Sequence, residues 1–133
     1  MHQRDKKTRK KLCDTVTNLH NQTASYLSKN YQKILLPEFG TSKLVIGDLA
    51  PSVKNEMMSY RFYDFKMKLN HLCNINGSKL NIVNESFTTR TCTRCGTLNN
   101  AIGGKKVFHC STCKLTIDRD INGARNILLK RLG

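Results

Sequence analysis

The sequence has few acidic residues, no tryptophan and no long apolar run. Among its 133 residues, 9 are Asp or Glu and 2 are Pro. The absence of a long apolar run excludes a membrane-spanning helix and the core of a signal peptide. A membrane surface is disfavoured as a partner too, because no long basic helix carries a Trp or Phe face. The sequence therefore predicts an intracellular protein without a membrane partner, nuclear or cytoplasmic at sites of DNA and not secreted.

The excess of basic residues predicts a polyanionic partner. The 23 Lys and Arg residues give a formal net charge of +14, which repels itself unless it meets a polyanion such as DNA or RNA. Two simpler interpretations stay open, because a charge run often forms a solvated helix face and cations near a metal–thiolate centre can offset its charge. The candidate nucleic-acid contacts are Arg4, Lys6, Lys7, Arg9, Lys10, Lys11, Arg94, Lys105 and Lys106.

The spacing of apolar residues predicts an α/β fold with one core. Helical periodicity indicates a helix over about 12–28, an amphipathic helix over about 55–73 and a last helix from about Asp120. Short apolar or alternating runs predict strands at 31–37 and 79–84, while 44–46 fits a strand or a loop. The side chains predicted to face the core of these helices are Leu12, Val16, Leu19, Tyr26 and Leu27, then Met58, Phe62, Phe65, Leu69 and Leu72, then Ile121, Ala124, Leu128 and Leu132.

Four of the 6 cysteines form two Cys-x-x-Cys knuckles, which we call the first knuckle (Cys92 and Cys95) and the second knuckle (Cys110 and Cys113). This spacing predicts one tetrahedral zinc, with the segment between the knuckles folded back as a hairpin that turns at residues 103–104. Four thiolates leave no position for water, so the zinc is expected to be structural. A redox pair and an iron centre are the alternatives. Cys13 and Cys73 are expected to be buried as small hydrophobic side chains.

Three acids flank the cysteine region in sequence, namely Glu85, Asp118 and Asp120. Asp120 has two interpretations. It fits the N-cap of the last helix, because aspartate is a favoured cap. Alternatively, since the two ends of a ribbon lie close together, the three carboxylates could meet and hold Mg²⁺ for phosphodiester cleavage.

Several motifs resemble the C-terminal part of the transposon-encoded TnpB nucleases. They are residues 88–96, the second knuckle, and residues 117–128, which read Ile-Asp-Arg-Asp-Ile-Asn-Gly-Ala-Arg-Asn-Ile-Leu. Residues 36–42 and 83–88 are closer to the eukaryotic and viral Fanzor relatives, and the resemblance covers nearly the whole chain. It implies a partial RNase H-like (RuvC-like) core with an inserted four-cysteine zinc ribbon. The core would comprise residues 1–90, the ribbon 91–116, and a C-terminal acidic segment and helix of the core 117–133.

The resemblance also implies a site and partners. The family cleaves DNA under the direction of a guide RNA, with three acids and divalent metal. Asp120 matches the third acid. The position of the second acid in TnpB falls at Pro37, beside Glu38, so that acid is missing there. Fanzor-like sequences place the second acid after the following strand, and Glu85 matches that position. The first acid is expected before Met1, so we expect a DNA-binding chain that is inactive alone, whose partners include a guide RNA and an N-terminal half from another chain. The alternative is a stand-alone, transcription-type zinc-ribbon module.

Overall fold

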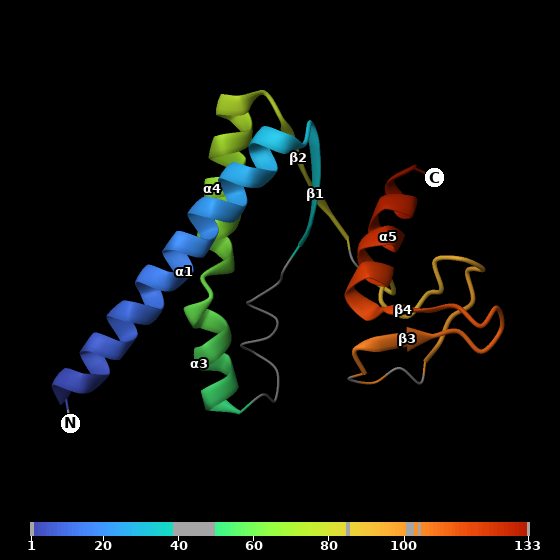
Figure 1. Cartoon of the computed structure of the whole chain (residues 1–133), viewed down its shortest axis with the longest axis horizontal. Coiled ribbons are helices and arrows are strands. Elements are labelled where there is room, and N and C mark those ends of the chain that lie inside the picture. The colour runs from blue at the N-terminus through green and yellow to red at the C-terminus, as the bar shows by residue number, and fades with distance from the viewer. Residues whose placement is uncertain (1, 39–49, 85, 101–102, 104, 133) are drawn as a thin grey trace. The chain divides into compact units, whose positions relative to one another are not determined.

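The computed structural model describes residues 2–38, 50–84, 86–100, 103 and 105–132, with side chains from Asp5 onward. The fold is α/β, and its elements in chain order are α1 (His2–Asn30), β1 (Lys33–Pro37), α3 (Pro51–Ser59), α4 (Phe62–Asn76), β2 (Lys79–Val83), β3 (Val107–His109), β4 (Thr116–Asp118) and α5 (Arg119–Leu132) (Figure 1). The chain forms two compact units. The first is Met1–Ile34 with Phe39–Asn81, and the second is Leu35–Glu38 with Ile82–Gly133.

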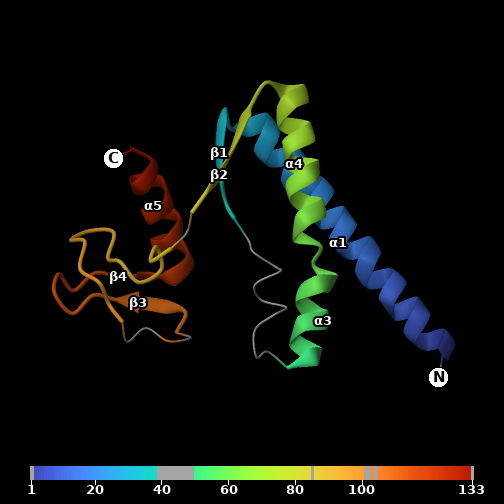
Figure 2. The same ribbon diagram turned by 180° about the vertical axis from the view of Figure 1, so that it is seen from behind.

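The first unit is built on the packing of α1 against α4, which lie side by side in both views (Figures 1 and 2). Ala24 on α1 and Leu69 on α4 are fully buried, and Cys73 is 1% exposed. Three hydrogen bonds tie the helices together in the same order along both, so α1 and α4 run in the same direction. The bonded pairs are Thr17–Arg61, Asn21–Lys68 and Ser28–Asn76.

The buried face of α1 differs from the predicted one. Leu19 and Tyr26 are exposed, at 60% and 58%, and Leu12 is exposed too. Met58, which lies on α3, is also exposed rather than in the core. Val16 is buried as predicted, but the rest of the buried row is Ala24 and Ser28, because small side chains at a spacing of four let the helices approach closely. The prediction for Cys73 is confirmed, whereas Cys13 is exposed and does not pack in a core.

The amphipathic helix predicted over 55–73 is two helices. Helix α3 ends at Ser59 and α4 begins at Phe62, with Arg61 between them in the left-handed conformation at φ 50° and ψ 50°. The N–H groups of Tyr60 and Arg61 donate to the carbonyls three residues back, at 3.3 and 3.2 Å. This tighter pattern closes the last turn of α3, and Arg61 then redirects the chain.

Strands β1 and β2 confirm the strands predicted at 31–37 and 79–84 and form one two-stranded sheet. The N–H of Lys79 donates to the carbonyl of Gln32 at 2.8 Å, and the N–H of Glu38 donates to the carbonyl of Val83 at 3.0 Å. Residue numbers therefore rise together along both strands, so the strands are parallel. Parallel strands need a crossover, which α3 and α4 supply. The possible strand at 44–46 lies outside the described residues.

The second unit contains a small antiparallel ribbon. Strands β3 and β4 pair in the register Val107↔Asp118, Phe108↔Ile117 and His109↔Thr116, and an isolated bridge joins Thr91 to Leu98. Each knuckle is itself the turn of a short hairpin, which was not predicted. The Asn99 side chain donates to the carbonyl of His109 at 3.0 Å, so the two ends of the segment between the knuckles lie together, in agreement with the predicted fold-back. Of the turn predicted at 103–104, only Gly103 is described, and its φ of 52° suits a turn.

Across the described ranges, no helix is long and apolar enough to cross a membrane.

Candidate metal centre

The two Cys-x-x-Cys knuckles share one backbone conformation. In each, the N–H of the first cysteine donates to the carbonyl five residues later, and its own carbonyl accepts from the N–H four residues later. The residue after the second cysteine is left-handed in both, with φ 76° at Gly96 and 60° at Lys114. The four bonds are Cys92 N to Thr97 O 2.9 Å, Gly96 N to Cys92 O 2.9 Å, Cys110 N to Leu115 O 2.9 Å and Lys114 N to Cys110 O 3.0 Å.

The two knuckles bring their four sulfur atoms into one cluster. All four Sγ atoms lie within 4.8 Å of one another. The Sγ atoms of Cys92 and Cys113 are 3.6 Å apart, as are those of Cys95 and Cys110. Sulfurs about 2.3 Å from a tetrahedral zinc lie about 3.8 Å from one another. The four cysteines can therefore hold one metal ion without rearranging the backbone.

The acidities of the sulfurs show why a cation suits this cluster. The hydroxyl of Thr97, hydrogen-bonded to the Cys95 sulfur, and the backbone of Thr97 lower the pKa of Cys95 to about 6. The backbone at Leu115 lowers the pKa of Cys113, but burial and the other three sulfurs outweigh it and raise that pKa to about 11. Four neighbouring thiolates repel one another, so all four ionise at neutral pH only with a bound cation. The donor set fits a soft divalent ion such as Zn²⁺.

The core of the ribbon is very small and centres on the cysteines. Phe108 is fully buried between Cys92 and Cys110, each 1% exposed, and Cys113, Leu115 and Ile117 pack against this cluster. His109 is exposed, and its Nδ1 lies 3.0 Å from Thr116 Oγ1. His109 therefore occupies the ribbon surface, as predicted.

Helix α5 docks on the first knuckle through asparagine side chains that the sequence analysis did not single out. Asn122 Nδ2 donates to the carbonyl of Thr91 at 2.8 Å, and its Oδ1 accepts from the N–H of Thr93 at 3.2 Å. Asn126 Nδ2 donates to the carbonyls of Thr88 and Thr91, each at 2.7 Å. The available signal was two asparagines at a spacing of four, which places both on one face of a helix.

The predicted apolar stripe of α5 is wrong for this unit. Ile121, Leu128 and Leu132 are 56%, 50% and 75% exposed, while the buried residues of α5 are Asn122, Gly123 and Asn126. A Cβ on Gly123 would lie 3.3 Å from Thr89 Cγ2, so the helix packs closely there. Polar burial prevails because the carbonyls at positions 88 and 91 require donors.

The two aspartates at the start of α5 have separate roles. Asp118 precedes the helix, and its Oδ1 accepts from the N–H groups of Asp120 and Ile121 at 2.8 and 3.1 Å. Asp118 is thus the N-cap, and the interpretation of Asp120 as the cap is wrong because Asp120 already lies inside the helix. The Asp120 side chain is 86% exposed, with an oxygen 3.7 Å from Arg119 Nε.

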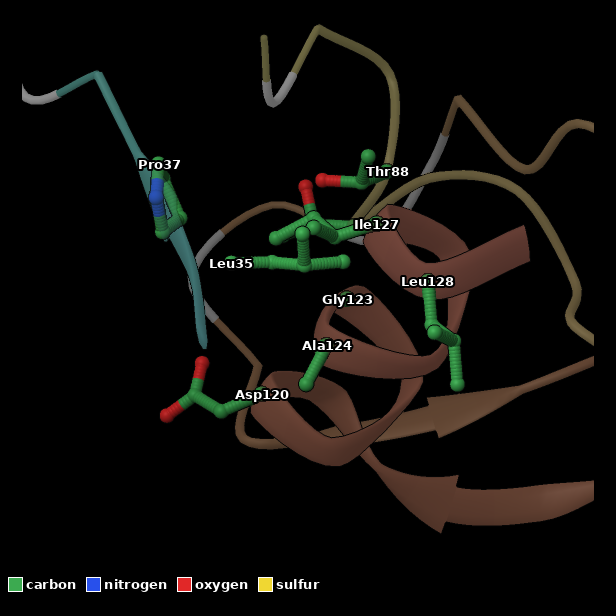
Figure 3. A pocket seen from close by; sticks show the side chains of 9 residues that line it. Leu35, Pro37, Thr88, Asp120, Gly123, Ala124, Ile127 and Leu128 are labelled. Carbon is green, nitrogen blue, oxygen red and sulfur yellow. The ribbon is translucent and has the colours of Figure 1, made fainter. Parts of the chain in front are cut away.

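Asp120 lies at the rim of a pocket of about 440 Å³ in the second unit (Figure 3). Figure 3 shows its carboxylate beside β1, at the edge of an apolar wall. Glu85, the second predicted acid, lies outside the described residues. The residues that line the pocket are Leu35, Pro37, Thr88, Thr89, Asp120, Gly123, Ala124, Ile127 and Leu128.

The predicted nucleic-acid contacts fall in two groups. Lys6, Lys7, Arg9, Lys10 and Lys11 are exposed along α1, and the side chain of Arg4 lies outside the described set. The ribbon residues Arg94, Lys105 and Lys106 are exposed in the second unit. Both groups are therefore accessible to a polyanion.

Comparison with known proteins assigns the chain to a class and then to a family. Residues 62–127 match the family described as Cas12f1-like, TNB domain. A cryo-EM structure of a Cas12f1–sgRNA–target DNA complex is similar with a TM-score of 0.65 at 20% identity, over 92% of this chain and 35% of that one. The fold and the cysteine site thus define a Cas12f1-like α/β protein with a four-cysteine cluster.

Viral relatives narrow the assignment. The TnpB-like protein L79 of Acanthamoeba polyphaga mimivirus is 27% identical over 126 residues, 92% of this chain and 24% of that protein. The putative transposase A625R of Paramecium bursaria Chlorella virus 1 is 34% identical over 113 residues, 85% of this chain and 26% of that protein. The chain belongs to the TnpB-like family. It spans about a quarter of the length of these curated relatives.

Proposed function

We propose that the chain is the nucleic-acid-binding C-terminal part of a TnpB-like protein, organised around a structural zinc ribbon. One observation carries this proposal: four sulfur atoms from two equivalent knuckles lie within 4.8 Å of one another. Zn²⁺ would be held by Cys92, Cys95, Cys110 and Cys113. Because four sulfurs fill a tetrahedral site, the ion would fix the ribbon rather than take part in chemistry.

DNA is the proposed partner, together with a guide RNA. The net charge of +14 supports this, as do the exposed cations of α1 and of the ribbon. The structurally similar Cas12f1 is itself described in complex with sgRNA and target DNA. Binding that rests on lysine and arginine contacts to phosphates should weaken steeply as salt rises.

An RNase H-like arrangement is the proposed core, with residues 1–90 and 117–133 in the core and 91–116 in the ribbon. The parallel pairing of β1 and β2 across a helical crossover supports it. Asp120 is the proposed third acid of a Mg²⁺ site, because its carboxylate is exposed and is not used as the helix cap. Glu85 is the proposed second acid.

Two acids of a set of three would leave these 133 residues able to bind DNA but not to cut it. The first carboxylate of a two-metal site bridges the ions, so a site without it should lose most of its rate. An N-terminal half, from another segment or another chain, would complete the site. The stand-alone ribbon module is less favoured, because its expected Asp120 cap is replaced by Asp118.

Divalent-metal binding and DNA binding together test this function. Titration with Mn²⁺, followed by calorimetry or paramagnetic broadening, should show a weak site that Asp120→Asn removes. The matched control is Asp118→Asn, which removes the same charge two positions away and keeps a good cap. Equal loss of Mn²⁺ binding in both variants, or DNA binding that is insensitive to salt, would contradict the proposal.

A further inference from the structure

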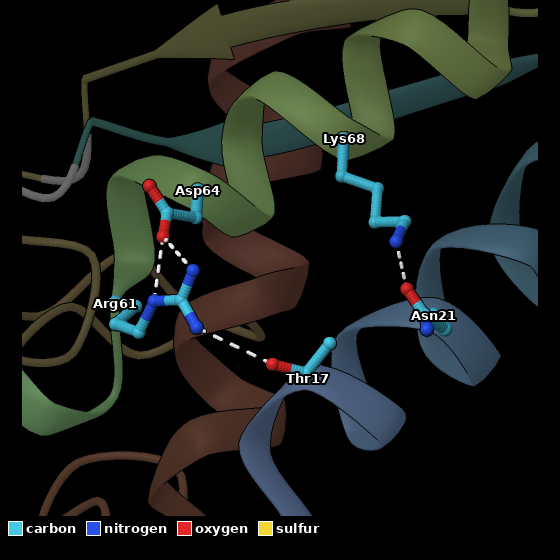
Figure 4. A network of polar contacts seen from close by, with 5 residues as sticks. All are labelled: Thr17, Asn21, Arg61, Asp64 and Lys68. Atoms are coloured by element: carbon cyan, nitrogen blue, oxygen red, sulfur yellow. Dashed lines mark hydrogen bonds and ion pairs between the residues drawn. The ribbon is translucent and has the colours of Figure 1, made fainter. Parts of the chain in front are cut away.

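A polar pocket of about 220 Å³ lies between α1 and α4, wholly inside the first unit. Its two cations are Arg61, just before α4, and Lys68 on α4. The acidic residue Asp64 also lies on α4, and the remaining lining residues are polar side chains from α1. Figure 4 shows Arg61 and Lys68 both extending from α4 toward α1. The lining residues are Thr17, His20, Asn21, Arg61, Asp64 and Lys68.

The two cations are held in place yet retain donors. Arg61 Nε donates to Asp64 at 2.6 Å, and Nη1 donates to Thr17 Oγ1 at 3.3 Å (Figure 4). Lys68 Nζ donates to Asn21 Oδ1. A guanidinium has five N–H donors and an ammonium has three, so each cation can donate further. Their side chains are therefore positioned in advance for an acceptor in the pocket.

The charges of this pocket sum to one positive charge. Arg61 and Lys68 contribute two positive charges and Asp64 one negative charge, while burial lowers the pKa of His20 and favours its neutral form. A phosphodiester carries one negative charge and presents oxygens that accept from guanidinium and ammonium groups. The pocket thus matches one backbone phosphate in both charge and donor type.

The backbone at Arg61 also separates this pocket from ordinary helix packing. Arg61 lies at φ 50° and ψ 50°, where glycine is the favoured residue. A strained non-glycine residue at such a position is often associated with a functional site. His20 supports the junction, because its ring is hydrogen-bonded to the backbone of Tyr60 and lies 5.2 Å from the ring of Phe65.

We propose that Arg61 and Lys68, with Thr17 and Asn21 behind them, form a binding site for one phosphate of a nucleic-acid backbone. The inference rests on the proposed nucleic-acid binding and adds a defined contact to it. None of these residues was among the contacts predicted from charge runs, because the site combines one cation before α4 and one on α4 with polar side chains from α1.

The test measures binding of the full zinc-loaded chain to a short mixed-sequence DNA duplex over a salt series. Lys68→Gln should weaken binding about tenfold, the value of one charge-assisted hydrogen bond. It should also lower the slope of log K against log salt by about 0.9, as expected for one lost phosphate contact. Lys66→Gln is the matched control, since Lys66 is equally half-buried on α4 but does not line the pocket. Equal slopes in Lys68→Gln and wild type would overturn the site, while salt-sensitive binding by the wild type would still support the proposed function.

Two further variants separate binding from folding. Arg61→Gly removes the guanidinium but suits the left-handed backbone, so the protein should stay folded and bind DNA about tenfold more weakly. Asp64→Asn removes the competing carboxylate and should tighten binding severalfold. Wild-type affinity in Arg61→Gly, or no gain in Asp64→Asn, would overturn the inference.

An inorganic phosphate arm separates a backbone phosphate from a free one. Free phosphate should displace the duplex no better than chloride at equal ionic strength. Stronger displacement would reassign the pocket to free phosphate and overturn the inference.

Discussion

The helical pair and the four-cysteine ribbon differ in what can stabilise them. Helices α1 and α4 bury Val16, Ala24, Leu69 and Cys73 along a long contact, which is ordinary core packing. Among the described ribbon residues, Phe108 is the one large buried side chain, and strands β3 and β4 have three residues each. So small a core cannot offset the conformational entropy of the ribbon, and the proposed metal at the cysteine cluster would supply the difference. The two regions should therefore respond differently to the same treatments.

The largest expected effect is the loss of one zinc ligand. Cys110→Ser should unfold the ribbon, because three thiolates and a hydroxyl bind zinc far less tightly than four thiolates. The helical signal of α1 and α4 should persist, which residue-resolved NMR or hydrogen exchange would show. Cys13→Ser is the control, since Cys13 is exposed on α1. A Cys110→Ser ribbon with native chemical shifts would contradict this expectation.

The reverse perturbation is a cavity in the helical pair. Leu69 is fully buried, so Leu69→Ala should lower the free energy of unfolding of the first unit by about 2–5 kcal/mol. Chemical denaturation followed on α1 and α4 would measure it. Zinc content should not change, and loss of zinc in this variant would show that the two regions are not separately stabilised.

A smaller effect is expected where α5 joins the ribbon. Asn126→Ala leaves the carbonyl of Thr88 without the donor that Asn126 supplies, and removes one donor from Thr91. The expected loss is about 1–3 kcal/mol of stability, because two buried hydrogen bonds donated by Asn126 are removed. Thermal melting of the zinc-loaded chain would measure it, with the exposed neighbour Arg125→Ala as control. Equal melting temperatures for the two variants would argue against the docking role.

The smallest effect compares the two knuckles. Lys114 occupies the left-handed position that Gly96 occupies in the first knuckle. Lys114→Gly should therefore leave stability unchanged or raise it by up to about 1 kcal/mol, whereas Gly96→Ala should lower it by about 1 kcal/mol. Thermal melting with zinc bound gives both values. A marked loss in Lys114→Gly would show that the Lys114 side chain has a role of its own.

The sequence predicted the features that depend on local spacing. The two knuckles came from cysteine spacing, and the strands near 33–37 and 79–83 came from short apolar or alternating runs. Cysteine spacing alone did not predict that each knuckle is itself the turn of a short hairpin. Family resemblance proposed Asp120 as a metal-binding acid, which stays a prediction. That Asp120 does not cap the helix was visible only once Asp118 was seen to accept from the first N–H groups of α5.

The features that depend on contacts distant in sequence were not predictable. The buried face of α1 depends on how closely α4 approaches, so small residues at 24 and 28 replaced the larger apolar ones. The buried side chains of Asn122 and Asn126 donate hydrogen bonds to carbonyls 31 to 38 residues away in sequence. Apolar periodicity carries no information about such partners. It also did not predict that the helix is interrupted at Arg61.

The most direct test of the central claim is the zinc content of the purified chain, measured together with the fold of the ribbon during chelation. We expect one zinc per chain bound by four thiolates, and loss of the ribbon but not of the α1–α4 pair when zinc is removed. A ribbon that keeps its native fold without metal, or with its cysteines joined as disulfides, would show that zinc does not hold it.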